Sequence, residues 1–323
     1  MQIVPLSPDH IDAVVRLWNE ALRAAGSEGF DRPIRPEQLR GAMVNANYLP
    51  SGALVALEGL APVGFGLGYI LTQDRHREGG LAEMPGYLAG LAVKPSHCGQ
   101  GIGAQLLDAV EQAVKDQGKD RIIFKTYGTA IPLTMGAAVD TEPFRFFGRR
   151  GYRAIHHELV LRNDLRGRTR RDSINQRRDA LAAEGITYRL FGPEDRDELL
   201  DFSSRYFAPE WRTTLDAATI EFRPDCPIRL ALDGDRLIGF MGPAWVPKRG
   251  GEGHFGSPGV DPEYRGRGIG KVMFHLGLNW LAEQGAVTTG YTTAAWNPAQ
   301  HIYFDAGAKL LAVIAETLEK PLG

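Results

Sequence analysis

Two pairs of matching helices are predicted by apolar residues that recur at helical spacing. Ile11, Val14, Val15 and Trp18 predict a helix that follows a short strand starting at Ile3. The segment from Tyr188 to Glu194 repeats that strand-to-helix transition. Further along, one apolar face contains Ile102, Leu106, Val110 and Val114, and its counterpart contains Ile269, Met273, Leu276 and Trp280. The chain is therefore expected to use the same helical layout twice.

Two predicted hairpins lie between these helices. Residues 54–67 contain two short apolar runs separated by a Glu-Gly turn. Residues 228–240 contain two such runs on either side of Asp233-Gly234. Each hairpin is followed by a strand, a glycine-rich turn and the second helix of its half. This order predicts mixed α and β structure.

The same segments recur as sequence. Residues 56–59 (Ala-Leu-Glu-Gly) match 231–234 (Ala-Leu-Asp-Gly) at an offset of 175, 93–103 match 260–270 at 167, and 147–151 match 303–307 at 156. The order is preserved while the offset falls, as insertions and deletions in loops produce. With 323 residues, the chain is expected to hold two domains, 1–164 and 186–323, joined by 165–185.

The connecting segment is rich in arginine. Residues 162–178 hold seven arginines, with acidic residues nearby and no interleaved aromatics. We interpret them as the solvated face of a connecting helix rather than a nucleic-acid site.

Composition narrows the class of protein. The net charge of −2 gives no general attraction to nucleic acid or anionic membrane. Two cysteines, Cys98 and Cys226, form neither a disulfide scaffold nor a zinc motif, so no metal site is expected. The N-terminal residues carry no signal-peptide pattern, and no stretch is apolar enough to cross a membrane. A cytoplasmic protein is expected.

The glycine turn at 264–271 (Tyr-Arg-Gly-Arg-Gly-Ile-Gly-Lys) carries the candidate chemistry. Glycines there let backbone N–H groups approach an anion, and the helix that follows adds its positive N-terminal dipole. Arg265 and Lys271 add charge. The pattern predicts a pyrophosphate cradle.

Two known cradles fit poorly. The P-loop fails because Arg265 stands where its first glycine belongs and Val272 follows the lysine. A dinucleotide-binding fingerprint is satisfied by Gly99 to Ala104, but the second copy has Lys271 where a small residue is required. A nicotinamide-dependent oxidoreductase rests on that one match.

The second copy contains a valine-x-proline strand end and a glycine turn at 260–270, together with Asn297, Tyr303 and Gly307. These features resemble the signature of the GNAT superfamily of acyl-CoA N-acyltransferases. The resemblance covers most of the chain. It implies an α+β fold of two tandem domains. Each would be a mixed, mostly antiparallel sheet with flanking helices and a splayed pair of parallel strands.

The resemblance also implies that acetyl-CoA is the co-substrate. The strand and turn of the second copy would bind it through Val260, Arg265, Gly266, Arg267, Gly268, Ile269, Gly270, Lys271 and Asn297. The first copy offers Leu91, Val93, Gly99, Gly101, Gly103 and Ala104 at the matching positions. Whether one or both copies bind is open.

The two copies differ in reactive side chains. By the resemblance, Tyr303 protonates the departing thiolate, whereas the first copy has Phe147, which has no proton to donate. Arg265 and Asn297 correspond to Cys98 and Thr141. We therefore expect the second domain to be catalytic and the first to be degenerate.

The base is expected four residues before the family's backbone N–H donor. That position is His254, with Glu252 as the neighbouring alternative. The donor position itself is Pro258, which has no N–H, unless a bulge at 256–259 shifts the register.

The sequence therefore predicts an N-acetyltransferase that acts on a primary amine of a small molecule or peptide, as a monomer or homodimer. The segment 203–211 is expected near the acceptor. The departures at Cys98, Phe147 and Pro258 leave a non-catalytic acyl-CoA-binding module as the alternative.

Overall fold

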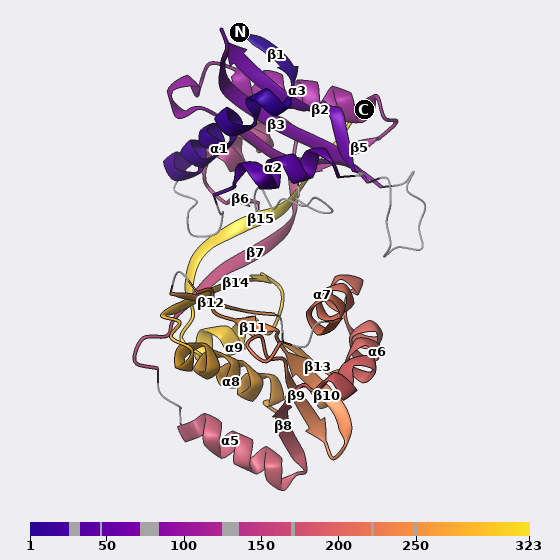
Figure 1. The fold of residues 1–323 in the computed structure, drawn as a ribbon, viewed down its shortest axis with the longest axis vertical. Coiled ribbons are helices and arrows are strands. Elements are labelled where there is room, and N and C mark those ends of the chain that lie inside the picture. The colour runs from indigo at the N-terminus through magenta and orange to yellow at the C-terminus, as the bar shows by residue number, and fades with distance from the viewer. Residues whose placement is uncertain are drawn as a thin grey trace. The chain divides into compact units, whose positions relative to one another are not determined.

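The computed structural model describes residues 1–25, 33–45, 47–71, 84–124, 136–168, 172–220, 223–248, 251–256 and 258–323. They form two compact units (Figure 1). Unit 1 comprises residues 1–160 and 311–323, and unit 2 comprises residues 161–310. The predicted repeat of α and β elements is confirmed in both units.

Unit 1 is built on a mixed sheet in the order β1-β2-β3-β4-β5-β15. Its strands are β1 (Gln2–Pro5), β2 (Tyr48–Glu58), β3 (Ala61–Ile70), β4 (Gly86–Val93), β5 (Arg121–Phe124), β6 (Ala137–Ala138), the first part of β7 (Arg153–Asp164) and most of β15 (Lys309–Pro321). Neighbours are antiparallel except β4 and β5, whose described residues run parallel from Gly86 to Leu88 with Ile122 to Phe124.

Helices cover both faces of this sheet (Figure 1). They are α1 (Ile11–Ala25), α2 (Pro36–Met43), α3 (Ile102–Lys115) and α4 (Glu142–Arg149). The predicted apolar faces of α1 and α3 are buried in two separate clusters. Each fully buried aliphatic side chain contributes about 1.5–3 kcal/mol, so these faces fix the helices on the sheet.

Each unit is completed by a strand end from the other copy of the repeat. Residues 311–323 close unit 1, where β15 pairs antiparallel with β5 through Leu318 opposite Phe124. Conversely, residues 161–164 of β7 belong to unit 2. There the Asn163 side chain accepts a hydrogen bond from the Tyr291 hydroxyl at 2.6 Å and donates one to the Ala306 carbonyl at 3.1 Å. The boundaries at 164 and 186 stay a prediction about the repeats.

Lys320 ties the exchanged strand into unit 1. Its Nζ lies 2.5 Å from Glu111 Oε2 in α3, while Glu111 Oε1 accepts a hydrogen bond from Tyr152 at 3.1 Å. Glu111 is only 8% exposed. A lone carboxylate at such a depth is costly, so the ammonium group offsets its desolvation.

We expect Lys320→Met to destabilise unit 1 by about 3 kcal/mol, because it leaves a mostly buried carboxylate unpaired. Hydrogen exchange of the β5 amides in the full chain measures this effect. Adding Glu111→Gln should restore most of the protection, since the uncompensated charge is then gone. Unchanged exchange in Lys320→Met would show that the pair does not stabilise the exchanged strand.

Unit 2 repeats the layout in two sheet portions. Strands β8 (Ile186–Leu190), β9 (Arg229–Asp233), β10 (Arg236–Met241) and β13 (Gly259–Val260) are antiparallel in the order β13-β10-β9-β8. The other portion contains β11 (Ala244–Trp245), β12 (Glu252–Phe255), β14 (Thr288–Ala294) and the end of β7. Parallel pairing of β12 with β14 stops after Gly253 and Thr289. The expected separation of a parallel strand pair is therefore present in unit 2.

The helices of unit 2 are α5 (Asp172–Ala183), α6 (Arg196–Tyr206), α7 (Pro209–Ile220), α8 (Ile269–Glu283) and α9 (Gln300–Asp305). The expected apolar face of α8 is confirmed at Ile269 and Met273, but Leu276 and Trp280 are only half-buried. Phe274 and Leu278 are fully buried instead. Helix α5 packs against α8 as well as the sheet, which widens the buried surface of α8.

That packing corrects the interpretation of the arginine-rich segment. The Arg166 side chain is 71% exposed, as expected, and that of Arg178 is 37% exposed. Arg168, however, donates hydrogen bonds to Asn279 and contacts the His275 ring nitrogen, both at 2.9 Å, and Arg177 reaches the glycine turn. These two are half-buried because their helix-flanking segment and α5 pack on unit 2. Arg170 and Arg171 lie outside the described residues.

Candidate active site

The two glycine turns have the same backbone conformation. Gly99 and Gly101 have φ of 78° and 80°, and Gly266 and Gly268 have φ of 79° and 82°. Only glycine adopts this left-handed region without strain. At Gly99 and Gly266 an added Cβ would meet nothing within 4 Å. The outer side of each turn is therefore open, as a phosphate cradle requires.

A third glycine holds each turn against its strand. A Cβ at Gly103 would lie 3.4 Å from Val93, and one at Gly270 would lie 3.4 Å from Val260. The residue before this third glycine is a buried isoleucine in both units, Ile102 or Ile269. No side chain caps α3 or α8, whose N-caps are Gly101 and Gly268. The first backbone N–H groups of both helices are thus left for an anion.

The basic side chains of the second turn have protein partners. Arg265 donates to the Val260 carbonyl at 3.2 Å, Lys271 lies 2.9 Å from Asp305, and Arg267 lies 2.5 Å from Glu184. The Glu184 carboxylate raises the pKa of Arg267 above its ordinary value. In unit 1 the Cys98 thiol lies 3.7 Å from the Lys94 carbonyl, in place of the Arg265 guanidinium.

Tyr303 lies in an aromatic cluster where β12 and β14 separate. Its ring centroid is 4.9 Å from that of Phe274 and 5.0 Å from that of Tyr291, which in turn lies 5.2 Å from Phe255. Burial raises the pKa of Tyr303 to about 12, and a hydrogen bond with the Thr293 side chain opposes that shift. The hydroxyl is therefore protonated throughout the neutral range.

Unit 1 has phenylalanine at the two positions of this cluster that are tyrosine in unit 2. Phe147 takes the place of Tyr303 in α4 and stacks on Phe124 of β5 at 4.7 Å. Phe147 is 4% exposed, much like Tyr303 at 6%. Phe147 and Tyr303 are therefore alike in burial, but only Tyr303 has a proton to donate.

His254 and Glu252 alternate with residues that face α8. Gly253 packs on Leu281, and Phe255 packs on Phe274. Because successive strand side chains point to opposite faces, Glu252 and His254 share the face turned away from α8. The His254 ring lies 5.1 Å from the Trp245 ring. His254 is thus the neighbour along β12 of Phe255, a member of the Tyr303 cluster, but its side chain lies on the opposite face of the strand.

The register places Pro258 at the position of Leu91. Val260 pairs with Gly239 and Gly259 with Phe240, as Val93 pairs with Gly64 and Ala92 with Phe65 in unit 1. Between Phe255 and Gly259 the strand is interrupted, and the Gly256 N–H donates to the Pro243 carbonyl at 2.7 Å. Ser257 lies outside the described residues. Unit 2 therefore has no backbone N–H at the position where unit 1 has that of Leu91.

Asn297 organises the turn before α9. Its side-chain oxygen accepts a hydrogen bond from the Ala299 N–H at 3.0 Å, and its carbonyl accepts one from the Gln300 N–H at 3.1 Å. In unit 1, the Thr141 hydroxyl donates to the Ala138 carbonyl at 2.6 Å. Both residues precede the helix that carries Tyr303 or Phe147.

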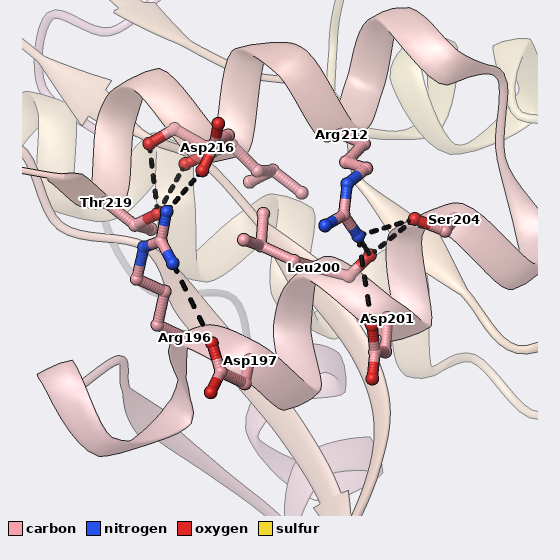
Figure 2. A network of polar contacts seen from close by, with 9 residues as sticks. Arg196, Asp197, Leu200, Asp201, Ser204, Arg212, Asp216 and Thr219 are labelled. Carbon is pink, nitrogen blue, oxygen red and sulfur yellow. Dashed lines mark hydrogen bonds and ion pairs between the residues drawn. The ribbon is translucent and has the colours of Figure 1, made fainter.

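Two arginine side chains bond helices α6 and α7 to each other (Figure 2). Arg196 of α6 bonds to Asp216 of α7, and Arg212 of α7 donates to Ser204 at 2.8 Å and to the Leu200 carbonyl at 3.0 Å. The connecting loop presents Phe207. Each of the two helices therefore supplies one arginine that binds the other helix.

Phe207 connects this helix pair to β13. Its ring stacks on Trp211 at 4.7 Å, and a Cβ at Gly259 would lie 2.6 Å from the ring tip of Phe207. Within the segment 203–211, expected near the acceptor, Phe207 and Trp211 therefore form an apolar wall, and Phe207 packs against the strand that leads to the glycine turn.

Four contributors were missed by the sequence interpretation: Thr293, Tyr291, Arg177 and Asp305. The sequence did contain evidence for Tyr291, because the offset of 167 aligns it with the aromatic residue Phe124 of the first copy. Arg177 and Asp305 had none, because each reaches the site from a segment whose packing the sequence pattern leaves open.

Among the residues that the structure describes, no three His, Cys, Asp or Glu side chains gather in a way that could hold a metal ion. In the same described ranges, no helix combines the length and apolarity needed to cross a bilayer.

The comparisons with known proteins define the class. The model of the Acetyltransferase (GNAT) family matches residues 11–132 and again 196–307. The chain therefore belongs to the GNAT family, with two tandem domains, and it is an acyl-CoA-dependent acetyltransferase. This result also removes the basis for the nicotinamide-dependent alternative.

Two relatives are mycothiol acetyltransferases. That of Rhodococcus opacus is 27% identical over 281 residues, covering 77% of this chain and 85% of the relative. That of Actinosynnema mirum is 27% identical over 310 residues, covering 88% and 93%.

Solved structures share the fold over nearly the whole chain. A tandem GNAT protein from the clavulanic acid biosynthesis pathway has a TM-score of 0.65 at 17% identity, covering 100% of this chain and 98% of its own. The glucosamine N-acetyltransferase region of a fungal β-N-acetylglucosaminidase has a TM-score of 0.72 at 23% identity, covering 98% of this chain and 38% of that one.

Proposed function

We propose that unit 2 transfers an acetyl group from acetyl-CoA to a primary amine of a small molecule or peptide. The observation that carries this proposal is the difference between two equivalent and equally buried helix positions, 147 and 303. The buried Tyr303 keeps a hydroxyl where the equally buried Phe147 has none. Unit 1 is then a degenerate copy.

The residues present fit the nucleotide end of acetyl-CoA. The open space over Gly266 and the uncapped start of α8 leave backbone N–H groups for its pyrophosphate. Arg265 and Lys271 flank this cradle, and Val260 ends the strand along which the pantetheine arm would lie. Unit 1 has the same open backbone at Gly99 and Gly101, so binding there is compatible with the fold.

When bound, acetyl-CoA supplies an activated thioester. The neutral amine forms the new C–N bond as the C–S bond breaks, and the electron pair of that bond leaves on the thiolate. Tyr303 then donates its phenolic proton to the thiolate, in line with its location in the cluster between α8 and β14.

The proton released by the amine goes to His254, directly or through a water molecule, with Glu252 as the alternative acceptor. Pro258 removes one backbone donor for the developing negative charge. Losing such a donor in other enzymes costs about 3–4 kcal/mol of transition-state stabilisation. The apolar wall at Phe207 and Trp211 lies on the acceptor side.

Calorimetric titration of the full chain with acetyl-CoA tests the proposal first. Binding at one or two sites per chain is expected, and thiol release is then followed with a panel of amines. The panel holds glucosamine, an aminoglycoside, a peptide N-terminus and, after the relatives named mycothiol acetyltransferase, the deacetylated form of mycothiol.

No binding at millimolar acetyl-CoA would contradict the proposal. Binding without thiol release for any amine would favour a non-catalytic acyl-CoA-binding module, for which the proline at 258 is the supporting observation.

A further inference from the structure

Helix α5 and the residue after its C-terminal turn contact the glycine turn of unit 2. Arg177 Nε donates a hydrogen bond to the Arg267 carbonyl at 2.8 Å, and a second guanidinium nitrogen contacts the same oxygen. Glu184 binds the Arg267 side chain at 2.5 Å. One residue of the turn is therefore held at its backbone and at its side chain by a segment outside the repeated sequence.

The hydrogen bond to the Arg267 carbonyl orients the whole peptide unit that follows Arg267, and not only its oxygen atom. The peptide unit from Arg267 to Gly268 is planar, so its C=O and N–H point in opposite directions. Glycines on both sides of Arg267 leave the orientation of this peptide free to change. Holding the carbonyl on Arg177 therefore sets the direction of the Gly268 N–H.

Arg177 is itself held in place. It is half-buried, and a Cβ on Gly268 would lie 3.0 Å from its Nε. Its positive charge opposes the upward shift that burial gives to the pKa of Tyr188 in β8, so the guanidinium also lies near that ring. A side chain confined by β8 and by the turn loses little further freedom when it donates these bonds.

The equivalent turn of unit 1 is arranged differently. Gln100 stands at the position of Arg267, and its side chain bonds to the Ser96 carbonyl within the same turn. A Cβ on Gly101 would meet only the Gln105 side chain, at 3.9 Å. Within the described part of unit 1, the turn is therefore held by residues of the turn itself and of α3.

We propose that Arg177 is a positioning residue for acyl-CoA binding in unit 2. By holding the Arg267 carbonyl away from the ligand side, it presents the Gly268 N–H to the pyrophosphate before binding. This inference rests on the proposed function, because it assigns Arg177 to the same cradle.

The test compares Arg177→Gln, Arg177→Lys and the neighbouring control Arg178→Gln in the full chain. Arg178 pairs with Asp179 at 3.1 Å on the exposed side of α5. Dissociation constants are measured by calorimetry for acetyl-CoA and by ligand-observed NMR for S-acetylpantetheine, which lacks the pyrophosphate. Circular dichroism reports folding of each variant.

We expect Arg177→Gln to weaken acetyl-CoA binding about tenfold, with S-acetylpantetheine affinity and kcat at saturating acetyl-CoA unchanged. Arg177→Lys keeps one donor and should fall between wild type and Arg177→Gln. Arg178→Gln should match wild type. Only a residue that orders the pyrophosphate cradle separates the two ligands in this way.

Wild-type affinity for acetyl-CoA in Arg177→Gln would overturn the inference and leave the proposed function standing. An equal loss for both ligands would also overturn it, because it would indicate general destabilisation of unit 2. If Arg177→Gln does not fold, Arg177→Lys decides by the same comparison. A wild-type protein that does not bind acetyl-CoA would contradict the proposed function itself.

Discussion

Replacing Gly268 by glutamate should raise the dissociation constant of unit 2 for acetyl-CoA at least a hundredfold. The φ of 82° at Gly268 costs other residues about 1–2 kcal/mol. The new Cβ would also lie 3.0 Å from Arg177 Nε, and the carboxylate would meet the ligand's pyrophosphate. Calorimetric titration measures the loss, which at a hundredfold corresponds to about 2.7 kcal/mol.

Gly101→Glu in unit 1 is the matched control. Its φ of 80° imposes the same backbone strain, while a Cβ there would meet only Gln105 at 3.9 Å. We expect this variant to keep full turnover. Gly268→Ala separates strain from charge and should weaken binding less than Gly268→Glu. Full activity in Gly268→Glu would move the chemistry to unit 1.

Tyr303→Phe should lower kcat about a hundredfold with little change in the affinity for acetyl-CoA. A positioned general acid typically contributes two to four orders of magnitude. The ring stays in its cluster, 4.9 Å from Phe274, so the packing of α9 is preserved. Stopped-flow or steady-state thiol release, together with calorimetric binding, separates the two quantities.

Tyr291→Phe is the control for this second prediction. It removes the hydroxyl of a half-buried tyrosine in the same cluster, together with its 2.6 Å hydrogen bond to Asn163. That change should cost about 1 kcal/mol of stability and leave kcat within a few-fold of wild type. Unchanged turnover in Tyr303→Phe would remove Tyr303 from the acid role.

The pH dependence of wild-type kcat follows from the same hydroxyl. Because burial raises the pKa of Tyr303 to about 12, its donating form is complete at neutral pH and is lost only as the pH rises toward that value. No alkaline loss of kcat from this group is expected below about pH 10. A loss limb near neutral pH would belong to another residue.

Local backbone features of the site followed from the sequence. Gly266 and Gly268 predicted a turn that only glycine adopts easily, and both have left-handed φ. The repeat predicted the same turn in unit 1, where Gly99 and Gly101 match it within a few degrees. Such features depend on residue types at fixed spacing, so a single sequence carries them.

Strand exchange was not predicted. The sequence assigned 309–321 to the second copy, which is its position along the chain, but Leu318 and Lys320 pair with β5 in unit 1. Hydrophobic periodicity predicts that a segment is a strand but not which strand it pairs with, so it does not say whether 309–321 joins β5 of unit 1 or β14 of unit 2.

The sequence by itself determined that this chain holds two GNAT-like halves. It also determined that only the second half has a tyrosine, Tyr303, at the position where the first has Phe147. It also determined that proline stands at 258, where no backbone N–H can exist. These are properties of residue identity and order. The tertiary structure decided which segments meet: Lys320 with Glu111, Lys271 with Asp305, and Arg177 with the turn that precedes α8. Such contacts join residues dozens to hundreds of positions apart, and their geometry is set by how sheets and helices pack rather than by local spacing.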